Sequence, residues 1–457
     1  MMTEENRKKA DQLNRRSFIR KTAGTGIGAA AVLAGAENVQ AALKPQSKKG
    51  FSPFRQEYDS IDDIYDIAPD YKRMHQKNII FARGVWSRPL DKPEGKFWSF
   101  FAKWTQTIAN SMDGEPGFSP LEHALNLASW ASVDTGTPFT SGGMKGLGVF
   151  NDWNRHSNPK VFKDYKFKTP VEASKYIKRA SNFLGADMVG IAPFDERWVY
   201  SKWIDYRNVI FEGAKEPLIE DAVFPFKPKS VIAIGFQMDR LAMSAPGYLM
   251  DTAAGLEYSH MAEVGHRIAV FLNHLGYKAI PAGNDTAMSI PIAAQAGLGE
   301  LSRMGTLINE KYGSGIRLAK VYTDLEITPD KPVTFGVQEF CKKCKKCATH
   351  CPSNAISVED EPSDKPNTGS ISSHPGVTKW YQNNEKCFGQ WEKDGAGCGI
   401  CLHVCPYNKM DTWVHDLAKL AVGVPIGRDI ARQLDDAFGY GRLEPGNVQK
   451  FWDKAVD

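Results

Sequence analysis

All eight cysteines of this 457-residue chain fall within one short segment, and this clustering restricts the fold more than any other feature. The first four are separated by two, two and three residues, and proline follows the fourth: Cys341, Cys344, Cys347 and Cys351. The second four keep the last two spacings and the proline, but their first gap has ten residues: Cys387, Cys398, Cys401 and Cys405. The pattern is typical of bacterial ferredoxins with two 4Fe–4S clusters.

In two-cluster ferredoxins the fourth cysteine of a run binds the other cluster. We therefore expect the following two sets of ligands: Cys341, Cys344, Cys347 and Cys405 on one cluster, and Cys351, Cys387, Cys398 and Cys401 on the other. A disulfide framework does not need these spacings followed by proline. A zinc site favours two separated pairs of ligands. The motif predicts electron transfer, but it does not identify a substrate.

The N-terminal segment has the features of a targeting signal. Arg15 and Arg16 begin a twin-arginine pattern, a weakly apolar run covers residues 23–36, and Ala41 ends a small-residue cleavage site. The apolar run is too short and too rich in Gly and Ala to span a bilayer. We predict a twin-arginine signal peptide over residues 1–42, which would export the protein already folded. A disordered basic tail is the alternative.

Outside this segment the chain carries almost no net charge. The whole chain has 57 Lys and Arg against 53 Asp and Glu, and the first 41 residues account for most of the difference. No basic field is left to attract nucleic acid or anionic lipid. No other stretch approaches 18 consecutive apolar residues, so we expect any membrane attachment to come from a partner.

Strand and helix signals alternate in the middle of the chain, which indicates an α+β layer fold. Thr169, Pro170 and Glu172 form a helix-start signal with a capping box. The expected helices cover residues 170–184, 258–276 and 289–296, and the expected strands cover residues 188–192, 231–236, 278–281 and 316–325. The expected domains are the signal peptide (1–42), an N-terminal region (43–165), a core (166–334), a two-cluster module (335–415) and a C-terminal tail (416–457).

A twin-arginine leader, a central layered domain and a C-terminal two-cluster module occur in this order in the reductive dehalogenases, and the chain resembles that family over nearly its whole length. The segments that carry the resemblance are residues 185–192, 296–303, 323–325 and 329–332, together with the cysteine run. The resemblance implies a nitroreductase-like core that buries a cobalamin-type corrinoid in the base-off mode. No Asp-x-His-x-x-Gly motif for a His lower ligand is present, which agrees with that mode.

The resemblance also implies a set of site residues. Tyr258, at the start of Tyr-Ser-His-Met, matches the tyrosine that serves as proton donor in the family. Arg303 matches the arginine paired with that tyrosine, and Asn284 matches a pocket asparagine. Trp391 falls where the family has an aromatic pocket wall. Corrinoid contacts are poorly marked in sequence, and our choices are Ser289, Gly297, Gly299 and Thr306.

Reductive removal of a halogen needs two electrons and one proton. Side chains cannot supply the electrons, so a cofactor must; the resemblance implies Co(I) corrinoid that receives electrons from the two clusters. A phenol is a poor acid because its pKa is about 10. A neighbouring arginine stabilises the phenolate and makes the phenol a better proton donor. An asparagine amide can donate to developing negative charge.

The predicted enzyme is therefore a reductive dehalogenase that replaces halogen by hydrogen on an organohalide, and we favour a small chlorinated alkene or alkane. The alternatives are a halophenol-type reductive dehalogenase, an epoxyqueuosine-reductase-like enzyme and an electron carrier with clusters alone. A tRNA-binding enzyme would need a basic stripe that this chain lacks. Expected partners are a small integral-membrane anchor and a quinol or other low-potential donor chain, at the outer face of the cytoplasmic membrane.

Overall fold

The computed structural model describes residues 55–86, 115–130, 164–205, 218–284, 286–408, 435 and 443–454. The predicted signal peptide, most of the predicted N-terminal region and most of the predicted C-terminal tail lie outside these ranges. Among the described residues, no helix is both long and apolar enough to cross a membrane.

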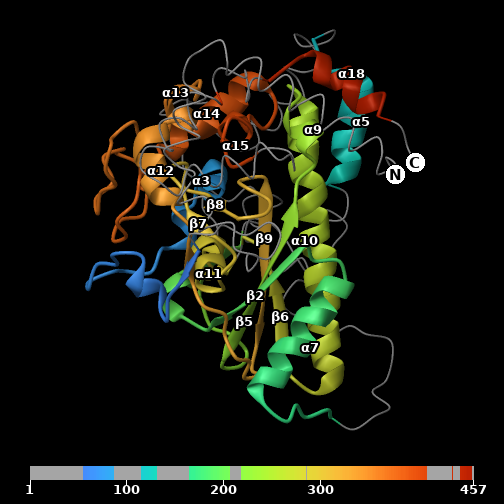
Figure 1. The fold of residues 1–457 in the computed structure, drawn as a ribbon, viewed down its shortest axis with the longest axis vertical. Coiled ribbons are helices and arrows are strands. Elements are labelled where there is room, and N and C mark those ends of the chain that lie inside the picture. Colours follow the sequence, from blue (N-terminus) through green and yellow to red (C-terminus); the bar gives the residue numbers. More distant parts are fainter. Residues whose placement is uncertain are drawn as a thin grey trace, which may run out of the picture.

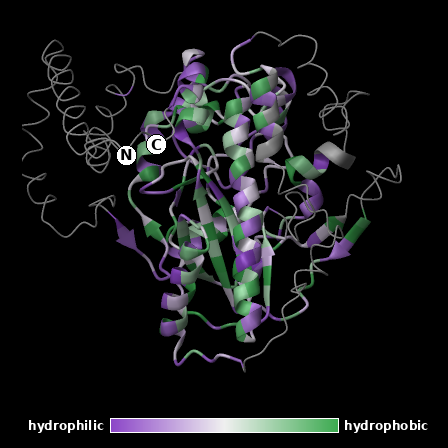
Figure 2. Ribbon diagram, turned by 90° about the vertical axis from the view of Figure 1, so that its right-hand side faces the viewer, coloured by the Kyte–Doolittle hydropathy of each residue, from purple (hydrophilic) through white to green (hydrophobic). Residues whose placement is uncertain are grey.

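A four-stranded antiparallel sheet forms the centre of the molecule (Figure 1). Its strands, in spatial order, are β2 (Met188–Pro193), β5 (Ser230–Gln237), β9 (Ile316–Thr323) and β6 (Ala279–Ala282). All four were predicted from their apolar runs. The two central strands are buried along nearly their whole length because helices cover both faces of the sheet, and Figure 2 shows the apolar residues concentrated on these strands.

Successive side chains of β5 point to opposite faces of the sheet, as the two-residue period of a strand requires. Ile232 and Ile234 pack in the apolar cluster beneath α7 (Pro170–Phe183) and α10 (Tyr248–Leu275). Val231 and Ala233 belong to the cluster beneath α11 (Ser289–Gln295) on the other face. The predicted α+β layer architecture is therefore confirmed, whereas the nitroreductase-like description stays a prediction.

Helix α7 begins where the sequence predicted. The Thr169 side chain accepts a hydrogen bond from the Glu172 backbone N–H at 3.1 Å. The Glu172 carboxylate accepts from the backbone N–H of Lys168 at 2.6 Å, one residue before the position that a capping box would use. The helix ends at Phe183, and Gly185, just after the C-cap residue Leu184, has a φ of 120° that favours glycine.

Helix α10 begins ten residues before the predicted start, so that prediction was wrong at this end. Residues 248–255 are buried on all sides between the sheet domain and the cysteine module. A helix buried on every side has no polar stripe, and the period that marks a surface helix is therefore missing there. Gly247 precedes the first turn with a φ of 72°.

The cysteine module lies at one end of the sheet (Figure 1). Its helices are α12 (Val337–Cys344), α13 (Lys346–Thr349), α14 (Asn384–Asp394) and α15 (Ile400–His403). Glu300 joins this module to the sheet domain, because its buried carboxylate accepts the backbone N–H groups of Phe335, Val337 and Gln338 at the start of α12. This contact satisfies N–H groups that have no partner within the helix.

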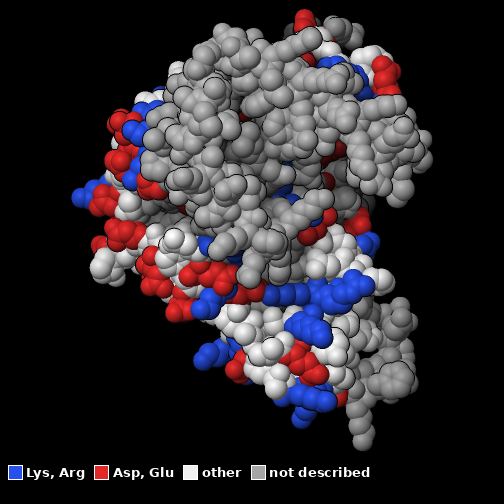
Figure 3. Space-filling view, in the orientation of Figure 1, with Lys and Arg blue, Asp and Glu red and all other residues white. Residues whose placement is uncertain are grey.

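Shorter elements surround this framework. They are β1 (Gln56–Glu57), η1 (Ile61–Asp63), η2 (Gln76–Asn78), α3 (Ile80–Trp86), α5 (Pro120–Ser129), η3 (Glu196–Trp198), β3 (Lys202–Asp205), β4 (Leu218–Asp221), α9 (Arg240–Met243), β7 (Glu300–Leu301), β8 (Leu307–Ile308), β10 (Val333–Thr334) and α18 (Gly446–Trp452). Strand pairs join β1 to β10, β3 to β4 and β7 to β8, and α5 lies along α10. Over the described part of the face in Figure 3, acidic and basic side chains are interspersed.

Candidate active site

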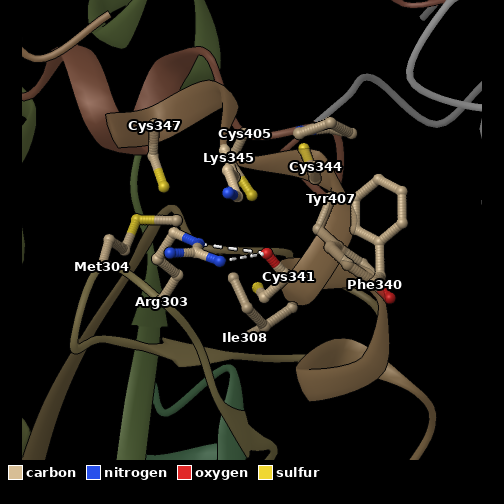
Figure 4. A pocket seen from close by; sticks show the side chains of 11 residues that line it. Arg303, Met304, Ile308, Phe340, Cys341, Cys344, Lys345, Cys347, Cys405 and Tyr407 are labelled. Carbon is tan, nitrogen blue, oxygen red and sulfur yellow. Dashed lines mark hydrogen bonds between the residues drawn. The ribbon is translucent and has the colours of Figure 1, made fainter. Parts of the chain in front are cut away.

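The four cysteines expected to bind the first cluster line one pocket (Figure 4): Cys341, Cys344, Cys347 and Cys405. Cys341 and Cys344 lie on α12, Cys347 on α13, and Cys405 just after α15. Lys345 has a φ of 51°, and this left-handed residue breaks the path between α12 and α13. The break turns Cys347 towards the thiols of α12. The four thiols expected to share one cluster thus line the same pocket, and their binding of iron stays a prediction.

The other four cysteines form a second group. Burial, and then the neighbouring Cys351 sulfur, raise the pKa of Cys387, Cys398 and Cys401, so these four sulfurs lie near one another. Ala355 donates its backbone N–H to the Cys351 sulfur at 3.3 Å. All eight cysteines are free, so the disulfide alternative is excluded.

Burial makes these thiols reluctant to ionise. It raises the pKa of Cys387 to about 12 and that of Cys398 to about 11, and it also raises the pKa of Cys341 and Cys401. Iron binds the thiolate, and its positive charge offsets the cost of burying an anion. Two groups of four sulfurs, with a backbone N–H directed at the Cys351 sulfur of the second group, fit two 4Fe–4S clusters.

Arg303 lies at the first cysteine group, so the predicted pairing of Arg303 with Tyr258 is wrong. The guanidinium is fully buried and donates to the Cys341 carbonyl from Nε at 3.0 Å and from Nη2 at 2.8 Å. Its Nη1 donates to the carbonyls of Ser357 and Glu359. Arg303 lies in the turn between β7 and β8, and backbone carbonyls of the cysteine module satisfy its fork of donors. Its fixed positive charge lies where it can tune a cluster potential.

Tyr258 and Asn284, which were both predicted as site residues, lie in contact. Tyr258 lies in the middle of α10, and Asn284 follows the end of β6. The Asn284 amide Nδ2 donates to the Tyr258 hydroxyl oxygen at 2.6 Å. The indole of Trp130 stacks on the Tyr258 ring with centroids 5.1 Å apart. The phenol therefore has a fixed ring plane and a fixed amide partner.

The cation beside Tyr258 is Arg317, which the sequence analysis missed. Its guanidinium carbon lies 5.9 Å from the centroid of the Tyr258 ring. Among the described residues, no acceptor bonds its buried Nε. Along β9, residue 317 shares a face with Ala319 and Val321, which pack against α10. The available signal was a charged residue in a strand whose neighbours on the same face are apolar, which indicates a charge with a function.

A buried carboxylate completes this side of the site. Asp251 accepts a hydrogen bond from Asn126 Nδ2 at 2.9 Å, and Trp130 also hydrogen-bonds to it. Burial raises the pKa of Asp251, while its hydrogen bonds and the positive charge of Arg317 oppose that rise. A methyl group on Gly397 would come within 2.6 Å of Asp251, so the segment just before Cys398 packs directly against this residue. The Tyr258 site and the cysteine module are therefore in contact.

The remaining predicted site residues have different surroundings. Trp391 contacts the rings of Phe81 and Phe388 between α3 and α14. The Ser289 hydroxyl lies 3.4 Å from the Asn284 side-chain oxygen and thus belongs to the Tyr258 site. A side chain on Gly297 or Gly299 would meet a backbone carbonyl of a neighbouring segment. The Thr306 carbonyl accepts a hydrogen bond from the Ser302 hydroxyl within a turn. Contact of these residues with a substrate or corrinoid stays a prediction.

Two groups of four thiols, and close to them a half-buried phenol with an amide and a guanidinium beside it, define an iron–sulfur oxidoreductase. Residues 340–408 match the model of the 4Fe-4S double cluster binding domain. The chain is 35% identical to the tetrachloroethene reductive dehalogenase of Desulfitobacterium hafniense, over 89% of this chain and 85% of that protein. It is 34% identical to the enzyme of the same name from Sulfurospirillum multivorans, over 63% of this chain and 60% of that protein. The chain belongs to the reductive dehalogenases, which are oxidoreductases that act on carbon–halogen bonds.

Solved structures show the same fold. A catabolic reductive dehalogenase superposes with a TM-score of 0.62 at 22% identity, over 85% of this chain and 49% of that chain. A second solved structure of a reductive dehalogenase, described as suggesting a mechanism for B12-dependent dehalogenation, superposes with a TM-score of 0.62 at 21% identity, over 92% of this chain and 54% of that chain. This chain thus spans about half the length of those solved chains.

Proposed function

We propose that this protein is a corrinoid-dependent reductive dehalogenase of small chlorinated alkenes or alkanes, with Tyr258 as the proton donor. The observation that carries the proposal is the hydrogen bond from Asn284 to the Tyr258 hydroxyl, with Arg317 beside the ring. Relatives named for tetrachloroethene and trichloroethene support this substrate class.

The chemistry of the Tyr258 site fits a corrinoid as neighbour. Arg317 is mostly buried, and its Nε has no acceptor among the described residues, so the site has an unused donor for a bound group. Ser289 and the loop before it would hold the corrinoid near Tyr258, in the base-off mode. When bound, the corrinoid would supply low-valent cobalt as the two-electron donor, with the clusters as its source of electrons.

The chain's own residues would manage the proton and the charge. Tyr258 would give its hydroxyl proton to the carbon that loses the halide, acting as a general acid. Arg317 would stabilise the phenolate that remains, because an arginine stays cationic at every relevant pH. Asn284 would donate a hydrogen bond to the same oxygen, and this hydrogen bond would become stronger as negative charge grows there. Trp130, stacked on the ring, would exclude water from one side of the phenol.

The cellular setting that we propose rests on the N-terminal motif. The twin-arginine pattern at Arg15 and Arg16 supports export of the folded protein to the outer face of the cytoplasmic membrane. A small integral-membrane anchor would hold the enzyme there, and a quinol or other low-potential donor chain would reduce the clusters. The nearly neutral composition supports the absence of nucleic acid among the partners.

Tyr258→Phe tests the proposed acid directly. The variant keeps the ring and its stacking but removes the proton, so chloride release from tetrachloroethene should fall by about 100-fold or more. Iron and cobalt contents should stay at the level of the unmodified protein. Tyr165→Phe is the matched control, because Tyr165 is 46% exposed and packs on Phe167. Full chloride release by Tyr258→Phe would contradict the assignment.

A further inference from the structure

Strand β9 carries a lysine whose whole side chain is buried. Lys320 is 1% exposed and pairs in register with Ala282 of β6 and Ala233 of β5. A lysine is rarely buried in a sheet, because an ammonium group needs compensating acceptors when it leaves water. The acceptors around Lys320 therefore indicate why the residue is there.

The ammonium group of Lys320 binds one loop at three places. It donates to the carbonyl of Gly283, to the carbonyl of Ala287 at 3.2 Å and to the hydroxyl of Ser289 at 3.0 Å. These residues lie on the connection from β6 to α11, which also carries Asn284. Lys320 thus fixes both ends of the segment that holds the amide partner of Tyr258.

The same loop is constrained from its other side. The Tyr200 hydroxyl donates to the Asn284 carbonyl at 3.2 Å. The Trp203 indole and the Tyr200 backbone N–H donate to the Thr286 carbonyl at 3.1 and 3.0 Å. Thr286 has a φ of 69°, which is a strained conformation for a β-branched residue. Strain of this kind persists only where the surroundings determine the conformation strongly, as they do at functional sites.

The hydrogen bonds from Lys320 to Tyr258 run in one direction. An ammonium group can only donate, so the Ser289 hydroxyl accepts from it and gives its own proton to one of two neighbouring acceptors, the Gly283 carbonyl at 3.2 Å or the Asn284 side-chain oxygen at 3.4 Å. The Asn284 side-chain oxygen lies 3.4 Å from that hydroxyl. The Nδ2 group at the other end of the Asn284 amide then faces Tyr258. The phenol oxygen accepts at the end of the series, which leaves the phenol proton free to point elsewhere.

We propose that Lys320 is a positioning residue, which acts through Ser289 and Asn284 to aim the Tyr258 proton away from the protein and towards the substrate. The inference rests on the proposed role of Tyr258 as proton donor. The donor-only ammonium sets the orientation of the Asn284 amide, and that orientation prevents Tyr258 from giving its hydrogen bond to Asn284. The series also places a positive charge where it polarises each bond towards the phenol oxygen.

Hydrogen–deuterium exchange of the folded, cofactor-loaded protein tests the hold on the loop without measuring activity. In Lys320→Met, amides in the peptide over residues 282–290 should exchange at least about five-fold faster than in the unmodified protein. Lys178→Met is the control, because Lys178 lies on α7 and pairs with Asp330 instead of with residues of this loop. Unchanged exchange over residues 282–290 in Lys320→Met would overturn the inference.

A double-mutant cycle tests whether Lys320 acts through Asn284. Lys320→Met should lower kcat by about 10- to 100-fold with little change in KM, because a small misplacement of a catalytic group has that cost. In an Asn284→Ala background the same substitution should lower kcat by less than about three-fold, since the residue through which it acts is gone. Equal losses in both backgrounds would show a structural role only and would overturn the proposal.

Ser289→Ala provides the second variant if Lys320→Met does not fold, because it removes one hydroxyl and leaves the buried charge in place. It should lower kcat in the normal background and have no further effect in Asn284→Ala. Full kcat in Ser289→Ala would overturn the inference. The unmodified protein is assayed in the same series: absence of chloride release there would contradict the proposed function, whereas unchanged loop exchange would contradict the role of Lys320 alone.

Discussion

Arg317 and Arg303 show that the position of a cation decides what it can do. Arg317 lies beside the Tyr258 ring with an unused donor, so its charge can act on a phenolate. Arg303 donates to the carbonyls of Cys341, Ser357 and Glu359, so its charge acts on the cysteine group. The two roles are electrostatic, and each depends on a site from which water is excluded.

Removal of the Arg317 charge should slow the chemical step. We expect Arg317→Gln to lower kcat by about 100-fold and to leave KM nearly unchanged, because the interaction with the phenolate exists only after the proton has left. Steady-state chloride release gives both constants. Arg267→Gln is the control, since Arg267 pairs with Glu263 on the exposed side of α10. An equal loss in the control, or a rise in KM without a change in kcat, would contradict the role of Arg317.

The site was only partly predictable at the level of single residues. The cysteine spacings predicted both ligand groups, because a cluster requires a fixed set of thiols and tight turns between them. Tyr258 and Asn284 were also predicted together. The arginine was misassigned because the sequence alone does not show which arginine faces α10, whereas the pairing of β9 with β5 places Arg317 on that face. Lys320 of the same strand was also missed, because a lysine in a strand usually points to solvent and the sequence does not show that both faces of β9 are covered.

Among the elements, those with local signals were predicted best. The strands of the sheet are apolar runs, and α7 has a polar outer face and a clear start. The first turns of α10 were missed because the neighbours that bury them, the cysteine module and α5, are distant in sequence. The break between α12 and α13 depends on a left-handed Lys345, a residue type that does not mark such a turn.

The start of α7 offers a test of local stability. Thr169→Ala removes the acceptor for the Glu172 backbone N–H, so the free energy of unfolding should fall by about 1 kcal/mol. Thr169→Ser keeps that acceptor and should cost much less. Chemical denaturation of the two variants provides the measurement, and chloride release should be unchanged in both. Equal stability of Thr169→Ala and the unmodified protein would contradict the capping role.

In the whole molecule, the cysteine module and the sheet domain share one core. Met250 on α10 packs directly against Gly399 at the start of α15. Residues 55–86 also join the two parts. Strand β1 pairs with β10, and Arg83 of α3 forms a buried ion pair with Glu385 of α14. The cysteine groups and Tyr258 are therefore joined through one packed core, as the proposed reaction, which needs electrons and a proton at one carbon, would require.

The metal content of the protein tests the central claim most directly. Protein prepared without oxygen and supplied with corrinoid should contain about eight iron atoms and about one cobalt atom per chain. Its EPR spectrum should show reduced clusters together with a base-off cobalt signal, and the same sample should release chloride from tetrachloroethene. The full iron content with no cobalt, despite the supplied corrinoid, would leave an electron carrier and would contradict the account.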